Sequence, residues 1–172
     1  MITIVSASNR QGNYTSIFAT HCLQLIREKG LDTQLLELDS LPEELSLQSV
    51  YEYETSVFAD YAERYFKNVE KFLFIVPEYN GSFPGILKLF IDAVHPKHYQ
   101  GKRAALIGVS AGRAGNLRGM DHLSDILNYL QVTVMPQKLP ISQLSDLLEH
   151  ERIIHQPTLD LLKQQVDKLA DF

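Results

Sequence analysis

The sequence has one cysteine, no long apolar run and no cluster of basic residues. A single cysteine, Cys22, excludes an intramolecular disulfide framework, and its place in an amphipathic stretch predicts a small core residue rather than a nucleophile. The N-terminal residues MITIVSA lack the basic and apolar regions of a signal peptide, and no apolar run is long enough to span a bilayer. We therefore expect a cytoplasmic protein without a membrane partner.

Metal-ligand patterns and a strong charge of either sign are also absent. The formal net charge is −5, which argues against nucleic acid as a partner. The six histidines show no ligand spacing such as H-E-x-x-H, so we expect no metal site. The length of 172 residues, with 45% hydrophobic and 22% charged, is typical of one globular domain, and we expect residues 1–172 to form a single domain.

Short apolar runs alternate with longer amphipathic segments along the chain. The runs, which we interpret as buried strands of a parallel sheet, are residues 2–5, 33–38, 71–76, 103–109 and 132–135. The amphipathic segments, which we interpret as helices, are residues 15–29, 56–68, 84–94, 116–130 and 158–169. This alternation predicts a flavodoxin-like α/β fold, a three-layer sandwich around a five-stranded parallel sheet in the order 2-1-3-4-5. Residues 42–55 and 136–156 have no clean period and are expected to be irregular connections, the first of them near a cofactor or a subunit interface.

In a sheet of this order, ligands bind beyond the carboxyl ends of strands 1, 3 and 4, and the loops after these strands have unusual compositions. The first, residues 6–15, leads into a helix N-terminus, where free N–H groups and the helix dipole favour an anion. Ser8, Asn13 and Thr15 add donors, and Arg10 adds a cation for phosphate oxygens. Because G-x-G-x-x-G and G-K-[ST] are absent, the loop suits a single terminal phosphate, although helix capping alone would also explain its composition.

The second loop, residues 77–85, follows the most apolar of the predicted strands. A planar heterocycle needs flat apolar contacts, which Tyr79 and Phe83 can supply, and hydrogen bonds at its edge, which Asn80 and the amides around Gly81 can supply. An ordinary turn is the alternative, because Asn-Gly and Pro-Gly favour turns. The length of the loop and the order Pro-Glu-Tyr-Asn-Gly favour the ligand interpretation.

The third loop, residues 110–119, places glycines on both sides of Arg113, and Arg118 follows one helical turn later. Such a backbone can cross the edge of a ring. The two arginines could contact a cofactor, a dinucleotide phosphate or a neighbouring subunit. A surface loop without a ligand is the alternative.

These loops carry a resemblance to a known family. Residues 77–88, PEYNGSFPGILK, are similar to the most specific motif of the NADPH-dependent FMN reductase family, which includes flavin, quinone, azo-dye and chromate reductases. Residues 8–13, SNRQGN, and residues 110–119 resemble its phosphate loop and its third flavin loop, and the similarity extends from residue 1 to about residue 130. The chain departs from the family at Ala7, where many members have glycine, and at Asn13, where many have serine.

The resemblance implies that FMN binds through residues of all three loops. It assigns Ser8, Arg10, Asn13, Tyr14 and Thr15 to the FMN phosphate, Pro77, Glu78, Tyr79, Asn80 and Gly81 to the isoalloxazine ring, and Ser110, Gly112 and Arg113 to the other edge of the ring. Glu78 is expected to orient its loop or to contact a partner subunit rather than to titrate in catalysis.

The same resemblance implies the reaction and the partners. N5 of FMN would accept hydride from NADPH or NADH and pass electrons to a flavin, a quinone or a similar small-molecule acceptor, with no catalytic residue from the protein. Members of the family are usually dimers or tetramers. We therefore expect a homodimer or homotetramer, with residues 56–68 and 91–99 as candidate contacts.

Two other functions compete with this one. A flavodoxin-type electron carrier would bind FMN without turning over NAD(P)H, but carriers usually combine a strongly acidic face with a phosphate loop that lacks arginine, unlike the loop that contains Arg10. A regulatory module that has lost catalysis is opposed by the intact second loop. Oxidation of NADPH with FMN and a quinone would separate the three.

Overall fold

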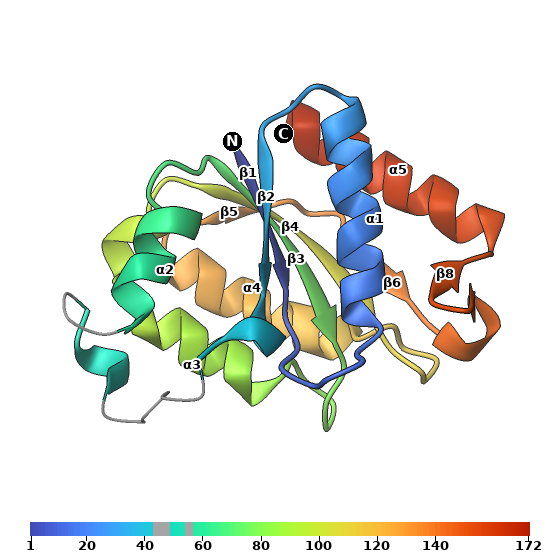
Figure 1. Ribbon diagram of the computed structural model, residues 1–172, viewed down its shortest axis with the longest axis horizontal. Coiled ribbons are helices and arrows are strands. Elements are labelled where there is room, and N and C mark those ends of the chain that lie inside the picture. The colour runs from blue at the N-terminus through green and yellow to red at the C-terminus, as the bar shows by residue number, and fades with distance from the viewer. Residues whose placement is uncertain (43–48, 54–56) are drawn as a thin grey trace.

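A computed structural model describes residues 1–42, 49–53 and 57–172. Its centre is a parallel sheet with helices on both faces (Figure 1). The strands of this sheet are β1 (Ile2–Ser6), β2 (Thr33–Glu37), β3 (Lys71–Pro77), β4 (Arg103–Val109), β5 (Thr133–Val134) and β6 (Leu139–Ile141). Their order, β2-β1-β3-β4-β5, confirms the predicted order and the flavodoxin-like fold class.

The helices α1 and α5 cover one face of the sheet, and α2, α3 and α4 cover the other (Figure 1). Their bounds are Thr15–Glu28 for α1, Val57–Tyr65 for α2, Gly85–Ala93 for α3, Leu117–Tyr129 for α4 and Gln156–Asp171 for α5. The first four lie within the predicted ranges, and α5 extends beyond its predicted range at both ends. Ser56, the predicted start of the second helix, lies outside the described residues. Within the described part of the chain, no helix combines the length and apolar character needed to cross a bilayer.

The strand predicted at residues 132–135 is confirmed as the short strand β5, but the sheet also contains β6, which the sequence did not predict. β5 pairs with the start of β4, and β6 pairs with its end. Because β3 pairs along the whole of β4, β5 and β6 both occupy the opposite edge of that strand. Pro136 follows β5, and a proline has no N–H to donate to the ladder. The chain therefore leaves the sheet after β5 and returns to it as β6. The apolar pattern of the sequence indicated only β5.

The predicted irregular stretch at residues 136–156 also contains more structure than expected. After β6 come the 3₁₀ helix η4 (Leu144–Asp146) and a hairpin of β7 (Leu148–Glu149) and β8 (Arg152–Ile153). Its turn residues, His150 and Glu151, have φ of +45° and +60°. A two-residue hairpin turn normally has glycine or asparagine at its central positions, where φ is positive. Neither is present, which is why the sequence did not indicate the hairpin.

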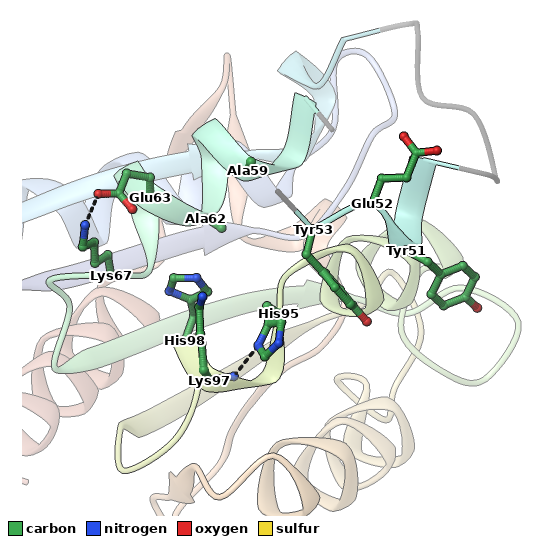
Figure 2. A pocket seen from close by; sticks show the side chains of 10 residues that line it. All are labelled: Tyr51, Glu52, Tyr53, Ala59, Ala62, Glu63, Lys67, His95, Lys97 and His98. Atoms are coloured by element: carbon green, nitrogen blue, oxygen red, sulfur yellow. Dashed lines mark hydrogen bonds and ion pairs between the residues drawn. The ribbon is translucent and has the colours of Figure 1, made fainter. Parts of the chain in front are cut away.

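The predicted irregular connection at residues 42–55 is described only in part. Residues 49–53 contain the 3₁₀ helix η2 (Ser49–Tyr51), and residues 43–48 and 54–55 lie outside the described residues. The ring of Tyr53 meets His95 edge-on, with centroids 5.0 Å apart, beside η3 (Pro96–His98) (Figure 2). Together with α2, these segments line a cavity of about 700 Å³. Its described lining shares no residue with the three predicted FMN loops.

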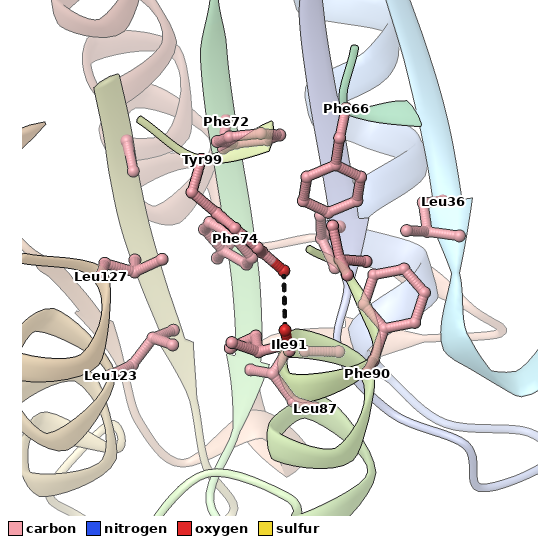
Figure 3. Packing of buried hydrophobic residues seen from close by; sticks show 14 of the residues in the cluster. Leu36, Phe66, Phe72, Phe74, Leu87, Phe90, Ile91, Tyr99, Leu123 and Leu127 are labelled. Atoms are coloured by element: carbon pink, nitrogen blue, oxygen red, sulfur yellow. Dashed lines mark hydrogen bonds between the residues drawn. The ribbon is translucent and has the colours of Figure 1, made fainter. Parts of the chain in front are cut away.

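The sheet separates two apolar cores. On the face covered by α2, α3 and α4, Phe66 contacts Phe72, Phe90 and Tyr99 with ring centroids 4.9, 5.7 and 5.2 Å away (Figure 3). Tyr99 is fully buried and donates its hydroxyl to the Ile91 carbonyl oxygen at 3.4 Å. Burial of a large apolar side chain contributes about 1.5–3 kcal/mol. Packing on both faces thus holds the strands in register, which brings their carboxyl ends to one edge.

Cys22 lies in the core between α1 and the sheet, where it is fully buried. Burial raises the pKa of its thiol to about 12, because the thiolate would lose its hydration. The thiol therefore stays protonated at neutral pH. We expect iodoacetamide at about pH 8 to leave the native protein unlabelled and to label the urea-unfolded protein, as measured by intact mass. Rapid labelling of the native protein would contradict this core assignment.

Candidate functional site

The loops that follow β1, β3 and β4 meet at one edge of the sheet. β1 and β4 both pair with β3 in parallel, so the three carboxyl ends lie side by side. Between the loops is a cavity of about 350 Å³, within the range of about 300–1,000 Å³ that small-molecule sites occupy. It is lined by Arg10, Gly12, Asn13, Tyr14, Thr15, Pro77, Glu78, Tyr79, Val109, Ser110, Ala111 and Leu144.

Predicted residues from all three loops line this cavity. They are Arg10, Asn13, Tyr14 and Thr15 from the first loop, Pro77, Glu78 and Tyr79 from the second, and Ser110 from the third. Ser8 is buried outside the lining, where its Oγ shares a hydrogen bond of 2.8 Å with the Tyr79 hydroxyl. The remaining predicted residues, which also do not line the cavity, are Asn80, Gly81, Phe83, Gly112 and Arg113. Phe83 packs instead against the apolar core under α3 and α4.

Some lining residues were not among the predicted ones. Gly12, Val109 and Ala111 are neighbours of predicted residues and follow from the position of the loops. Leu144 has a different origin, because it reaches the cavity from η4. It belongs to the stretch in which the sequence shows no period, so no signal pointed to it.

The first loop has the chemistry of an anion site. Arg10 is exposed, and α1 has no acidic residue in its first turn. The N–H groups of Gly12, Tyr14 and Thr15 donate no hydrogen bond to any part of the chain that the structure describes. Unpaired amides at a helix N-terminus carry partial positive charge and bind anions readily.

Asn13 braces this loop from within. Its Nδ2 donates to the Arg10 carbonyl oxygen at 2.8 Å and to Asp39 Oδ2 at 3.2 Å, and its Oδ1 accepts from the Ser16 N–H at 3.0 Å. Both ends of the amide are therefore already engaged. The side chain shapes the backbone around the cavity and caps the start of α1.

The tip of the second loop is a tight turn. Tyr79 and Ser82 exchange backbone hydrogen bonds of 2.9 and 3.1 Å, and Asn80 and Gly81 between them have φ of +53° and +78°. Asn-Gly favours such a two-residue turn with left-handed central residues. The turn is compatible with a ligand, because the N–H groups of Asn80 and Gly81 donate no hydrogen bond among the described residues.

Helix α4 contacts the second loop from outside. Arg118 Nη2 lies 3.8 Å from Glu78 Oε1, and a Cβ at Gly81 would lie 3.1 Å from the same nitrogen. His122 Nδ1 and Ser82 Oγ share a hydrogen bond of 2.9 Å. Glu78 and Arg118, whose partners the sequence left open, therefore contact each other within the chain.

The third loop is attached to the segment that follows β5. The Gly112 carbonyl oxygen accepts from the Gln143 N–H at 3.0 Å. Gly115 has φ of +56°, and a Cβ there would lie 2.6 Å from Pro140 Cβ. The loop and the segment can therefore approach closely only because residue 115 is glycine. This approach also brings Leu144 to the cavity.

Fold and site together define a class of protein, the flavodoxin-like α/β proteins with a ligand cavity where the strand order reverses. Solved structures share this fold. The flavoenzyme NAD(P)H:(acceptor) oxidoreductase FerB from Paracoccus denitrificans matches with a TM-score of 0.80 and 23% identity, over 99% of this chain and 94% of that one. A flavodoxin from the domain Archaea matches with a TM-score of 0.66 and 17% identity, over 99% and 97% of the two chains.

The sequence places the protein more narrowly: residues 1–146 match the NADPH-dependent FMN reductase family, and the chain belongs to this family. It is 29% identical over 170 residues to an NAD(P)H-dependent FMN reductase of Pseudomonas aeruginosa, covering 96% of this chain and 90% of the relative. It is 27% identical over 175 residues to a 2-hydroxy-1,4-benzoquinone reductase of Burkholderia sp, covering 98% and 93%. Family membership confirms the prediction of an FMN-dependent NAD(P)H oxidoreductase.

Proposed function

We propose that the cavity between the three loops holds FMN and that the protein uses it to transfer electrons from NAD(P)H to a small-molecule acceptor. The observation that carries this proposal is the meeting of an exposed cation, helix N-terminal amides and an aromatic side chain around one cavity. FMN has one terminal phosphate and one planar ring, and the lining offers partners for both. When bound, FMN supplies the hydride-transfer chemistry, and the protein contributes binding and orientation.

Arg10 and the start of α1 are proposed to hold the phosphate. A guanidinium can donate two hydrogen bonds to phosphate oxygens, and the amides of Tyr14 and Thr15 add donors at the positive end of the helix dipole. Asn13 acts through the loop that it braces. Ser8 links this loop to the second one, because its Oγ accepts from the Arg10 N–H at 3.2 Å and contacts the Tyr79 hydroxyl.

The second and third loops are proposed to hold the ring. Tyr79 and Leu144 offer apolar contacts on the cavity wall. Asn80 and Gly81 follow Tyr79 outside the lining, and their unpaired backbone N–H groups offer donors to the edge of a ring that extends beyond the cavity. These amides lie in a turn whose backbone is closed by its own hydrogen bonds, so little conformational freedom is lost on binding. Arg113 is exposed outside the lining, which favours the dinucleotide or a neighbouring subunit as its partner.

Residues 1–172 are proposed to work as one FMN-binding domain in the cytoplasm, where reduced nicotinamide nucleotides are available. The family match ends at residue 146, before α5. Leu162 and Val166 of α5 nevertheless lie in the same apolar cluster as Ile4 of β1 and Phe18 of α1. The last helix therefore covers the same face of the sheet as α1, the helix that follows the first loop.

Steady-state oxidation of NADPH with FMN and a benzoquinone tests this function. The quinone is chosen because one relative is a benzoquinone reductase. We expect turnover that requires both protein and FMN, with one quinone reduced for each NADPH oxidised. Free FMN without protein is the control. Tight FMN binding without turnover would contradict the proposal and favour an electron carrier.

A homodimer or homotetramer is also proposed, with the groove between α3 and α4 as the contact. The groove has a volume of about 590 Å³ and includes Ile91, Val94 and Leu130 in its lining. Tyr129, at its rim, is 87% exposed. An exposed aromatic side chain beside an apolar groove is typical of a protein interface. Residues 91–99, suggested from the sequence, contribute to this surface.

Tyr129→Glu should therefore lower the molar mass in solution to that of the monomer, because a carboxylate loses hydration in an apolar contact. Size-exclusion chromatography with light scattering measures the mass. Leu161→Glu is the matched control, since Leu161 is 44% exposed on α5 and outside the groove. A wild-type monomer, or an unchanged mass for Tyr129→Glu, would show that the contact lies elsewhere or does not form.

A further inference from the structure

Asn116, the residue before α4, joins the third loop to the start of the second. It is 1% exposed and has left-handed backbone angles, with φ of +60° and ψ of +33°. An asparagine at this position usually accepts from the first N–H groups of its helix. Here the side chain makes no such cap. Its Nδ2 donates instead to the carbonyl oxygens of Val76 at 3.0 Å and Pro77 at 2.9 Å, directly before Glu78.

The surroundings allow only this orientation of the amide. With Nδ2 and Oδ1 exchanged, an oxygen would face two carbonyl oxygens and repel both. Oδ1 points toward Gly119, where a Cβ would lie 2.1 Å from Oδ1 and 2.8 Å from the Phe83 nitrogen. Oδ1 is buried and has no hydrogen-bond partner among the described residues. A buried acceptor is rarely left unpaired, which indicates that the Nδ2 contacts determine this side chain's position.

A second glycine leaves room on the sheet side. Gly108 lies in β4, and a Cβ there would be 3.1 Å from Asn116 Cβ and 2.2 Å from the Gly115 carbonyl oxygen. Asn116 thus fits between two positions that carry no side chain. Two further polar contacts join α4 to the second loop, Arg118 with Glu78 and His122 with Ser82, and water can compete at both because the Arg118 side chain is exposed and the hydrogen bond of His122 lies at the surface. Of these contacts, only that of Asn116 is buried.

We propose that Asn116 is a positioning residue that sets the separation of the second and third loops, and with it the width of the cleft that receives the FMN ring. The proposal rests on the proposed function, in which FMN lies between these loops. In this proposal, the side-chain amide of Asn116 holds the backbone N–H groups of Asn80 and Gly81 at a fixed distance from Ser110 and Ala111, which form a wall of the cavity.

The test is Asn116→Gly, which keeps a left-handed backbone without strain and removes the side chain together with its amide. We expect the dissociation constant for FMN to rise about tenfold, and the visible bands and midpoint potential of bound FMN to shift. A purely structural role would lower the melting temperature without moving the spectrum or the potential. Gln131→Gly is the matched control, because Gln131 also has positive φ, is exposed and follows the other end of α4. It should leave all three flavin properties unchanged.

Wild-type affinity, spectrum and potential in Asn116→Gly would overturn the proposal. A measurement on the wild-type apoprotein keeps the test independent of how the variant folds: the side-chain amide protons of Asn116 should exchange slowly with solvent by NMR, and fast exchange would also overturn it. If the wild-type protein itself bound no FMN, the proposed function would fail first, which distinguishes the two failures.

Discussion

Arg10→Ala should raise the dissociation constant for FMN by about ten- to a hundredfold. A hydrogen bond to a charged group contributes about 1.5–3 kcal/mol, and about 1.4 kcal/mol corresponds to a factor of ten. Arg10 is the only cationic side chain among the described residues that line the cavity. The helix N-terminal amides remain in the variant, so binding should be weakened rather than abolished. Fluorescence titration of the apoprotein with FMN measures the change.

Two controls make this result specific to the phosphate. Riboflavin has the same ring without the phosphate, so its affinity should be nearly equal in the wild type and in Arg10→Ala. Arg27→Ala removes the same charge from the last turn of α1, at the far end of the helix, and should leave FMN affinity unchanged. An unchanged FMN affinity in Arg10→Ala, or an equal loss for riboflavin, would place the phosphate elsewhere.

Gly108→Ala should lower the free energy of unfolding of the apoprotein by about 1–3 kcal/mol and also weaken FMN binding. The added Cβ would lie 2.2 Å from the Gly115 carbonyl oxygen and 2.9 Å from Met120 Cε. The methionine side chain can turn away, but the backbone carbonyl can move only with the third loop. Because this loop forms one wall of the cavity, stability and FMN affinity should fall together.

Urea unfolding with and without FMN measures both effects of Gly108→Ala. Gly85→Ala is the control, since a Cβ at the first residue of α3 would meet nothing within 4 Å. It should leave stability unchanged or raise it by up to about 1 kcal/mol, because alanine restricts the unfolded chain. Equal stabilities and FMN affinities for the two variants would mean that the third loop does not depend on close approach at residue 108.

The sequence predicted the sheet because a strand buried on both faces must be apolar along its length. The runs at residues 71–76 and 103–109 are the clearest examples, and they became the central strands β3 and β4. The position of the cavity followed from the strand order, since parallel strands present their carboxyl ends at one edge. Asn80 and Gly81 form the turn that the sequence analysis named as the alternative interpretation of this loop, because left-handed angles at Asn-Gly are a local preference.

Features that depend on contacts between segments far apart in the sequence were not predictable in this way. Leu144 lines the cavity only because Gly115 lets its segment pack against the third loop, and neither residue signals the other in the sequence. An asparagine directly before a helix usually caps it, yet the side-chain amide of Asn116 donates hydrogen bonds to two carbonyl oxygens of β3. Asn13 was predicted as a phosphate ligand, and its amide is engaged within its own loop. For these polar side chains, the residue type indicated the part of the fold in which they lie but not their hydrogen-bond partners.

The most direct test of this account is the visible absorbance of the FMN-loaded protein, recorded without oxygen before and after addition of NADPH or NADH. We predict flavin bands that differ from those of free FMN, that remain after gel filtration, and that bleach when a reduced nicotinamide nucleotide is added. Addition of a benzoquinone should then restore them. A protein that retains no FMN, or whose flavin bands persist with both nucleotides, would contradict the central claim.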